Sequence, residues 1–135
     1  MRLTKRSEYG IIAMKYIASL DNGEACSARY IAEHFNLPQE ILAKIMQQLV
    51  KKGLVRSKKG KHGGYRLTQR PDRITLGDVI MAVEESLNVV DCSTEKGLKC
   101  DQMGLCNIEN PMKKIQRDLN NYFRSITLVD LEKEP

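Results

Sequence analysis

The fold is decided by residues 28–68, which read ARYIAEHFNLPQEILAKIMQQLVKKGLVRSKKGKHGGYRLT. The first eight predict a short helix that Ser27 can cap, because a serine hydroxyl accepts a hydrogen bond from the first turn. The sequence NLP at 36–38 breaks this helix, and its proline suits the first turn of a second helix that runs to about residue 52. Two helices joined by a three-residue turn predict a helix-turn-helix.

The period of the hydrophobic residues changes directly after this helix pair. Residues 54–57 (LVRS) and 65–68 (YRLT) predict two strands, and the glycine-bearing sequence between them predicts a turn. A strand pair that follows a helix-turn-helix forms a wing. The predicted fold class is therefore mainly α, a winged helix-turn-helix with a two-stranded wing.

Three further helices extend this unit in both directions. One starts at a capping Thr4 and continues to about Leu20, and a Thr75–Asp78 capping-box pattern starts another over about 76–85. The last and longest is expected over 111–125, where apolar residues recur at intervals of three and four. Its apolar positions are Met112, Ile115, Leu119, Tyr122 and Ile126. In the second helix of the helix-turn-helix, the expected buried positions are Ile41, Leu42, Ile45, Leu49 and Val50.

The composition limits the chain to one small globular core. Its 135 residues are too few for two ordinary domains with a linker, and 41% of them are hydrophobic and 29% charged. Lys and Arg number 22 against 17 Asp and Glu, which gives a net charge of +5. Eight of these bases and none of the acids lie in 51–70, so the rest carries 14 bases against 17 acids. The protein is a mildly acidic body with one basic segment.

Two classes of protein are disfavoured by the sequence. It has no apolar run near the roughly 20 residues of a membrane span. No signal-peptide core follows its charged start, so we expect a cytoplasmic protein that binds no membrane. It also has no nucleotide motif, no Cys-x2-Cys pair and no evident acid–base pair. A small electron-transfer or redox enzyme is therefore the least favoured alternative, and we expect no enzymatic activity.

The basic segment and the helix before it fit duplex DNA. An α-helix fits the major groove, and lysines at a glycine-rich turn can neutralise phosphates or enter a minor groove. A lysine turn alone is usually a solvated surface and a helix pair alone is usually ordinary packing. Their combination favours double-stranded DNA over RNA, since aromatic residues are only 5%. The residues placed for contact are Gln39, Glu40, Lys44, Gln47, Gln48, Lys58, Lys59, Lys61, His62 and Gly63.

Three of the four cysteines share one segment. Cys92, Cys100 and Cys106 are spaced C-x7-C-x5-C, without the close pairs that bring two thiolates to one zinc ion. Cytosolic thiols stay reduced, so metal or redox use is favoured over disulfides, and this wide spacing suits an iron–sulfur cluster. Thiol redox sensing and unligated cysteines remain alternatives. The candidates for a further ligand are Glu8, Glu109, Asp101, His34 and Cys26, of which we expect the last two to be packing residues.

Several short sequences occur together in this chain. They are MRLT at the start, KKGLVRS and GGYRLT around the predicted turn, ITLGDVI after it, the three-cysteine segment, and ITLVDL near the end. Together they resemble the Rrf2 family of bacterial regulators, which includes the iron–sulfur proteins IscR, NsrR and RirA. The resemblance covers nearly the whole chain and implies a homodimeric winged-helix transcription factor that binds a palindromic promoter operator.

The resemblance also implies a division of the chain and a ligand set. The division is a DNA-binding domain over 1–85, a cluster-binding cysteine loop over 86–110, and a dimerisation helix with a tail over 111–135. The family cysteines fall on Cys92, Cys100 and Cys106. IscR-like members place a histidine ligand where this chain has Glu109, and NsrR-like members use a carboxylate near the partner's N-terminus, where Glu8 stands. Glu8 is therefore the favoured fourth ligand and Glu109 the next.

Two departures from the family bear on the signal and the operator. The first cysteine gap, seven residues long, is longer than is common in IscR-like members and closer to the RirA type. The implied DNA contacts are Lys59 in the minor groove and Gln39, Glu40, Ala43 and Lys44 at the start of the second helix. Ala43 stands where cluster regulators can carry a base-reading glutamate, so the operator sequence stays open.

We hypothesise a transcriptional repressor whose operator affinity depends on an iron–sulfur cluster, 2Fe–2S or 4Fe–4S, that senses iron, nitric oxide or redox status. A ligand loop between the DNA-reading domain and the dimer helix could change the spacing of two recognition helices. Half-sites about 34 Å apart tolerate little error in that spacing. The alternative is a cluster-free regulator of the same fold, controlled by thiol oxidation or by a partner protein.

Overall fold

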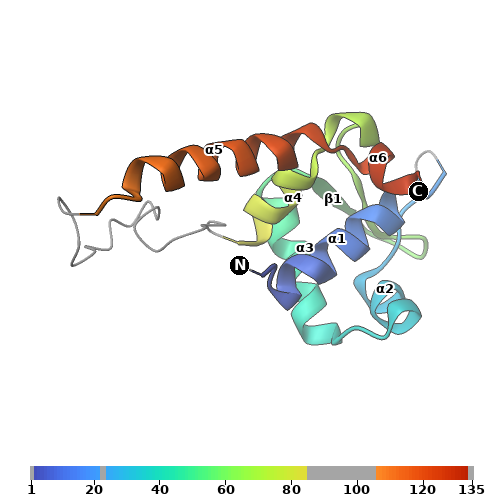
Figure 1. Ribbon diagram of the computed structural model, residues 1–135. Coiled ribbons are helices and arrows are strands. Elements are labelled where there is room, and N and C mark those ends of the chain that lie inside the picture. Colours follow the sequence, from blue (N-terminus) through green and yellow to red (C-terminus); the bar gives the residue numbers. More distant parts are fainter. Residues whose placement is uncertain (1, 22–23, 85–105, 134–135) are drawn as a thin grey trace.

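The computed structural model describes residues 2–21, 24–84 and 106–133. Cys92 and Cys100 lie outside the described residues. Figure 1 shows a body of short helices with one long helix, α5, that extends past it. The mainly α fold with a two-stranded wing is confirmed. The elements are α1 (Lys5–Ala18), α2 (Ala28–Phe35), α3 (Gln39–Lys51), β1 (Val55–Lys58), β2 (Gly64–Leu67), the 3-10 turn η1 (Pro71–Arg73), α4 (Leu76–Val83), α5 (Glu109–Ser125) and α6 (Leu128–Glu132).

The helix-turn-helix forms where the sequence predicts it. The Ser27 hydroxyl accepts a hydrogen bond from the Tyr30 N–H at 3.0 Å and caps α2. Asn36 ends α2 in the left-handed conformation, with a φ of 54°, which asparagine tolerates better than most residues. Helix α3 follows Pro38 directly and has no side-chain cap. The chain therefore turns from α2 to α3 within three residues.

The wing is a hairpin that also pairs with the segment before α2. Strands β1 and β2 are antiparallel, with Lys58 opposite Gly64 at the turn. Tyr65 and Cys26 exchange two backbone hydrogen bonds, with N···O distances of 2.8 and 3.1 Å. Gly64 has a φ of +141°, and a Cβ there would lie 2.3 Å from the Cys26 carbonyl carbon. Only glycine allows this approach, which ties the wing to the body.

Helices α1, α3 and α4 pack against one another around the core. The buried residues of α3 are Leu42, Ile45, Met46 and Leu49. Ile41 and Val50 were expected among them, and that expectation is wrong, since they are 40% and 37% exposed. Successive helical residues are rotated by about 100°, so a stripe through 42, 45, 46 and 49 leaves 41 and 50 at its edges. Met46, which the sequence analysis did not include, is fully buried.

Two capping boxes hold the C-terminal part of the chain against the body. Thr75 with Asp78 starts α4, as the sequence predicts, and Thr127 with Asp130 starts α6. Thr75 and Thr127 also form an isolated backbone bridge, and Leu128 of α6 is fully buried. The end of α5 is therefore anchored on both the strand-like segment before α4 and the core.

Helix α5 contrasts with the body. It begins at Glu109, two residues before the predicted start, and its N-terminal half projects beyond the other helices (Figure 1). Gln116 is its one buried residue, whereas Ile115 and Tyr122 are 48% and 61% exposed. Among the helices of the described ranges, α5 included, we find none that combines the length and the apolar character needed to cross a membrane.

Candidate DNA interface and metal centre

The predicted base-reading residues lie together at the start of α3. Gln39, Glu40 and Lys44 are exposed, and Ala43 between them is half-buried. Because Pro38 provides no side-chain cap, the N–H groups of the first turn and the positive end of the helix dipole stay open to an anion. This end of α3 can thus offer hydrogen-bond donors and acceptors to base edges and backbone donors to a phosphate.

The predicted wing contacts lie in the turn between β1 and β2. Lys58, Lys59, Lys61 and His62 are exposed, and within the described residues none of these lysines forms an ion pair. Gly63 is half-buried because the turn is tight, and a Cβ there would lie 2.2 Å from the Lys58 carbonyl oxygen. The turn therefore holds uncompensated cations on a backbone that requires glycine.

A cleft of ≈ 620 Å³, which we call the wing-tip cleft, separates this turn from the start of α2. Sequence reasoning missed its α2 side, because the pairing of Cys26 with β2 brings the two together and no local signal marks that pairing. Tyr30 is 48% exposed there, and its hydrogen bond with Tyr16 is the main cause that raises the pKa of Tyr16 to about 12. Tyr16 thus contributes a neutral hydroxyl to a cleft that lysines also line. The cleft is lined by Tyr16, Ser27, Tyr30, Lys58, Lys61 and His62, among others.

Two of the ligand candidates make packing contacts within the body. Cys26 is buried, and its burial raises the pKa of its thiol, so it stays protonated and unreactive. His34 stacks on Tyr30, with ring centroids 5.7 Å apart and an interplanar angle of 12°, and meets Phe35 edge-on at 4.7 Å. Both residues are accounted for by packing, as the sequence analysis expects.

Of the remaining ligand candidates, Asp101 lies outside the described residues, and the others lie at the start of α5 and in α1. Cys106 is half-buried just before α5, and Glu109 is the first residue of α5, where its carboxylate accepts from Lys113 at 2.9 Å. Glu8 lies in α1 and pairs with Lys5 at 3.1 Å, an interaction that raises the pKa of Lys5. The described residues hold no group of three possible metal ligands. In Figure 1 the start of α5 lies apart from the start of α1.

The first turn of α1 connects the end of α4 with α3. The Glu84 carboxylate accepts from the Thr4 N–H at 3.2 Å and from the Thr4 hydroxyl. Two residues further on, Arg6 Nη2 donates to Gln48 Oε1 of α3 at 2.6 Å. Glu84 is the last described residue before the cysteine segment. Side-chain contacts therefore connect Glu84 with α3, the helix that carries the predicted base-reading residues.

Comparison with known proteins identifies relatives over nearly the whole length. The family model Rrf2, described as an iron-dependent transcriptional regulator, matches residues 3–134. The HTH-type transcriptional regulator NsrR of Geobacillus kaustophilus (strain HTA426) is 30% identical over 131 residues, which are 97% of this chain and 89% of the relative.

Solved structures of related proteins share the fold. CymR (YrzC), the global cysteine regulator of B. subtilis, matches with a TM-score of 0.77 at 28% identity, over 97% of this chain and 95% of that one. T. potens IscR matches with a TM-score of 0.76 at 29% identity, over 97% and 85% of the two chains. The predicted winged helix-turn-helix is thereby confirmed.

Proposed function

The chain belongs to the Rrf2 family of transcriptional regulators, and on this premise we propose that it is a repressor whose operator affinity is set by an iron–sulfur cluster. Membership makes it a DNA-binding transcriptional regulator and not an enzyme. The repressor role, the cluster, the homodimer, the palindromic operator and the cytoplasmic location are our proposal. The signal it would sense is iron, nitric oxide or redox status.

The observation that carries the DNA contacts is the wing turn with its unpaired lysines. Lys58, Lys59 and Lys61 have no acidic partner among the described residues. The repulsion between their ammonium groups would fall if DNA phosphates lay beside them. In the complex we place the start of α3 in the major groove and this turn at the adjacent minor groove. Gln39, Glu40 and Lys44 would then face base edges, while Ala43 would pack against them.

The exposed stripe of α5 supports a homodimer. Ile108, just before α5, and Ile115 and Tyr122 within it repeat at seven-residue intervals along one side. With Tyr30, they are the most exposed large apolar residues of the chain's described part. Helix α5 turns a different side, with Phe123 and Asn120, toward α4. A second copy could cover the stripe with its own, since identical surfaces meet across a two-fold axis.

For the cluster we propose Cys92, Cys100 and Cys106 with Glu8 of the partner subunit, and Glu109 as the alternative fourth ligand. The donor set fits, because Cys106 is half-buried and the exposed Lys5–Glu8 pair is weakly held, so Glu8 can exchange its ammonium partner for a metal. A bound cluster would supply a centre whose charge and ligation change with iron supply, oxidation or nitric oxide. Cys92 and Cys100 stay untested, since both lie outside the described residues.

The contacts of α1 give the signal a route to DNA. Any movement that follows a change in ligation would pull on Glu84, and Glu84 holds Thr4 at the start of α1. Arg6 in the same turn holds Gln48 of α3. Shifts in α1 would thus tilt α3, and a palindromic operator senses the relative tilt of both copies. Coupling energies from double-mutant cycles across these contacts test this route.

A second candidate is a cluster-free regulator of the same fold that responds to thiol oxidation or to a partner protein. The match to a global cysteine regulator at 28% identity favours it, because that relative is described by cysteine and not by iron. The two candidates share the DNA interface and the dimer, and they differ only in what the cysteine segment holds.

Anaerobic purification separates them. We expect visible absorbance, bound iron and sulfide, and a native mass of a dimer plus clusters, all lost in Cys92→Ala. Glu8→Gln should keep the cysteine-bound iron but alter the spectrum and hasten cluster loss. In the wild type, operator affinity should differ between the protein with its cluster and the protein from which a chelator has removed the cluster. In Cys92→Ala, the chelator should leave operator affinity unchanged. A colourless protein that instead forms a Cys–Cys bridge under mild oxidation would establish the second candidate.

A further inference from the structure

A second cleft, which we call the wing-base cleft, lies where β2 leaves the body and α1 ends. Its volume is ≈ 660 Å³, within the usual range of about 300–1,000 Å³ for small-molecule sites. Its lining shares only Leu20 and Glu24 with that of the wing-tip cleft, and it includes no residue of α2 or α3. It is therefore separate from the surfaces that we assign to DNA.

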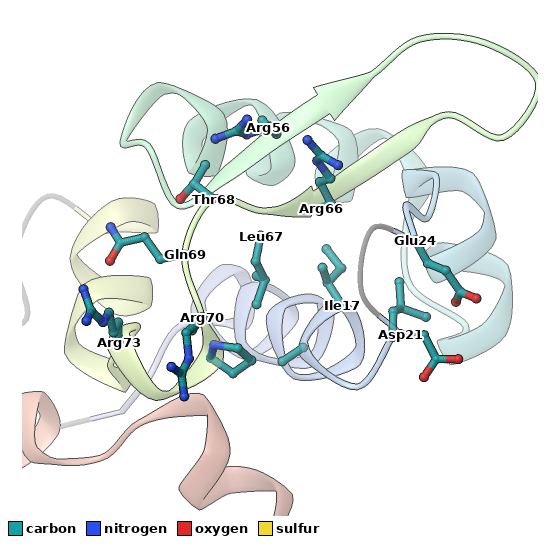
Figure 2. Close-up of a pocket in the computed structure, with 13 residues that line it drawn as sticks. Ile17, Asp21, Glu24, Arg56, Arg66, Leu67, Thr68, Gln69, Arg70 and Arg73 are labelled. Atoms are coloured by element: carbon teal, nitrogen blue, oxygen red, sulfur yellow. The ribbon is translucent and has the colours of Figure 1, made fainter.

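Four arginines line this cleft, on β1, β2 and the turn that follows β2 (Figure 2). The hairpin register sets Arg56 directly opposite Arg66, an arrangement in which like charges repel. Arg70 pairs with Asp72 at 3.0 Å, whereas Arg56, Arg66 and Arg73 have no ion-pair partner within the described ranges. Two guanidinium groups held side by side without an acid form a site that an anion would stabilise.

The rest of the lining limits the size and shape of that anion. Ile17 and Leu67 form an apolar wall between the arginines and the opposite side, where Figure 2 shows the carboxylates of Asp21 and Glu24. These carboxylates leave the lining with two excess positive charges. They can also accept hydrogen bonds from a hydroxyl or amine at the far end of a ligand.

We propose that the wing-base cleft binds a small multiply charged anion, such as a phosphate ester, a pyrophosphate or a dicarboxylate, with its charged end between Arg56 and Arg66. Its uncharged part would lie along Ile17 and Leu67. The same two arginines could instead contact a DNA phosphate, since the chemistry of recognition is shared. The proposal does not rest on the iron–sulfur cluster or on the repressor role, so it stands or fails separately from the proposed function.

The probe is pyrophosphate, titrated into the full-length protein at constant ionic strength, with chloride as the reference salt. Thermal unfolding and calorimetry should both report saturable binding by the wild type. Arg56→Gln with Arg66→Gln should weaken the affinity at least tenfold and keep the fold, because the substitutions remove a repulsive pair. Arg66→Lys keeps the charge but loses the paired N–H donors, so its affinity should fall between the two.

The matched control is Lys58→Gln with Lys61→Gln, which removes the same charge from the same hairpin on the side of the other cleft. It should leave pyrophosphate binding unchanged and weaken binding to duplex DNA. No difference between pyrophosphate and chloride in the wild type would overturn the proposal, and so would equal loss of binding in both double variants. If the arginine variant instead lost DNA affinity and salt dependence as the lysine variant does, the arginines would be assigned to DNA phosphates.

Discussion

Helices α3 and α5 are both amphipathic, but α3 buries its apolar side within the chain, whereas α5 leaves an apolar stripe exposed. The 13 residues of α3 bury four large apolar side chains against α1 and α4 of the same chain. The 17 residues of α5 bury one residue, the polar Gln116, which bonds to Asn120 at 3.0 Å. The body that carries α3 therefore forms its core within one chain, whereas the apolar stripe of α5 stays exposed, as we propose for a helix that meets a second copy.

The largest expected effect comes from charging the exposed stripe of α5. Ile115→Lys with Tyr122→Lys should convert the dimer to a monomer, because like charges would meet across the two-fold axis. Operator affinity should then fall by about 10²-fold or more, since linked half-site binding is lost. Light scattering after size exclusion measures the mass, and gel retardation measures the affinity.

The control for this variant is Asn121→Lys, which adds a lysine to an exposed position on another side of α5. It should remain a dimer with wild-type affinity. If the stripe variant kept both its dimeric mass and its affinity, α5 would not be the dimer helix, and the contrast with α3 would have another explanation.

Truncating one apolar residue in each helix sharpens the comparison. Leu42→Ala in α3 should lower the free energy of unfolding by about 3 kcal/mol at every protein concentration, because it leaves a cavity in the core of a single chain. Ile115→Ala should lower it only at concentrations where the dimer is populated. Urea unfolding across a hundredfold dilution series distinguishes them, and a concentration-independent effect at Ile115 would contradict the assignment.

Local signals explain why much of the body follows from the sequence. Ser27 and Thr75 cap their helices by bonds to residues three positions away, so the pattern is visible in a short window. The wing strands and their turn are likewise neighbours in sequence. The error at Ile41 and Val50 concerns the width of the buried stripe. Apolar residues at its edges look the same in the sequence as those inside it.

Long-range contacts explain what the sequence analysis missed. The bridge of Cys26 to Tyr65 creates the wing-tip cleft, and the bond of Thr4 to Glu84 spans 80 positions. The register that sets Arg56 against Arg66 also appears only when the hairpin forms. None of these pairs carries a residue type that marks it in advance. The candidate DNA residues could be found because cations gather in one turn, whereas the ligand set depends on residues from two helices and from outside the described ranges.

A smaller effect is expected from substitutions of lysines in the wing turn, which we compare with matched substitutions in α5. Lys58→Gln with Lys61→Gln should lower operator affinity roughly tenfold at 0.15 M salt and reduce the slope of log affinity against log salt by about 2. The matched variant, Lys114→Gln with Arg117→Gln on α5, should change neither. Fluorescence anisotropy over a salt series measures both quantities. An equal change of slope in the two variants would mean that α5 also lies along the DNA.

The smallest effect concerns α6, which returns the end of α5 to the body. The Thr127 N–H donates to the Asp130 carboxylate at 2.9 Å, and these bonds with Thr127 hold the pKa of Asp130 below its usual value of 3.8. A depressed pKa in the folded state means that the cap stabilises the fold above about pH 4 and loses this effect as pH falls through the lower, folded value. Asp130→Asn should therefore lower the urea midpoint of unfolding slightly at neutral pH and make that midpoint fall less steeply in acid.

Asp118→Asn, on the exposed surface of α5, is the control. Because α6 anchors only the C-terminal end of α5, both variants should stay dimeric, and a monomeric Asp130→Asn would show that the stripe needs this anchor to meet its partner.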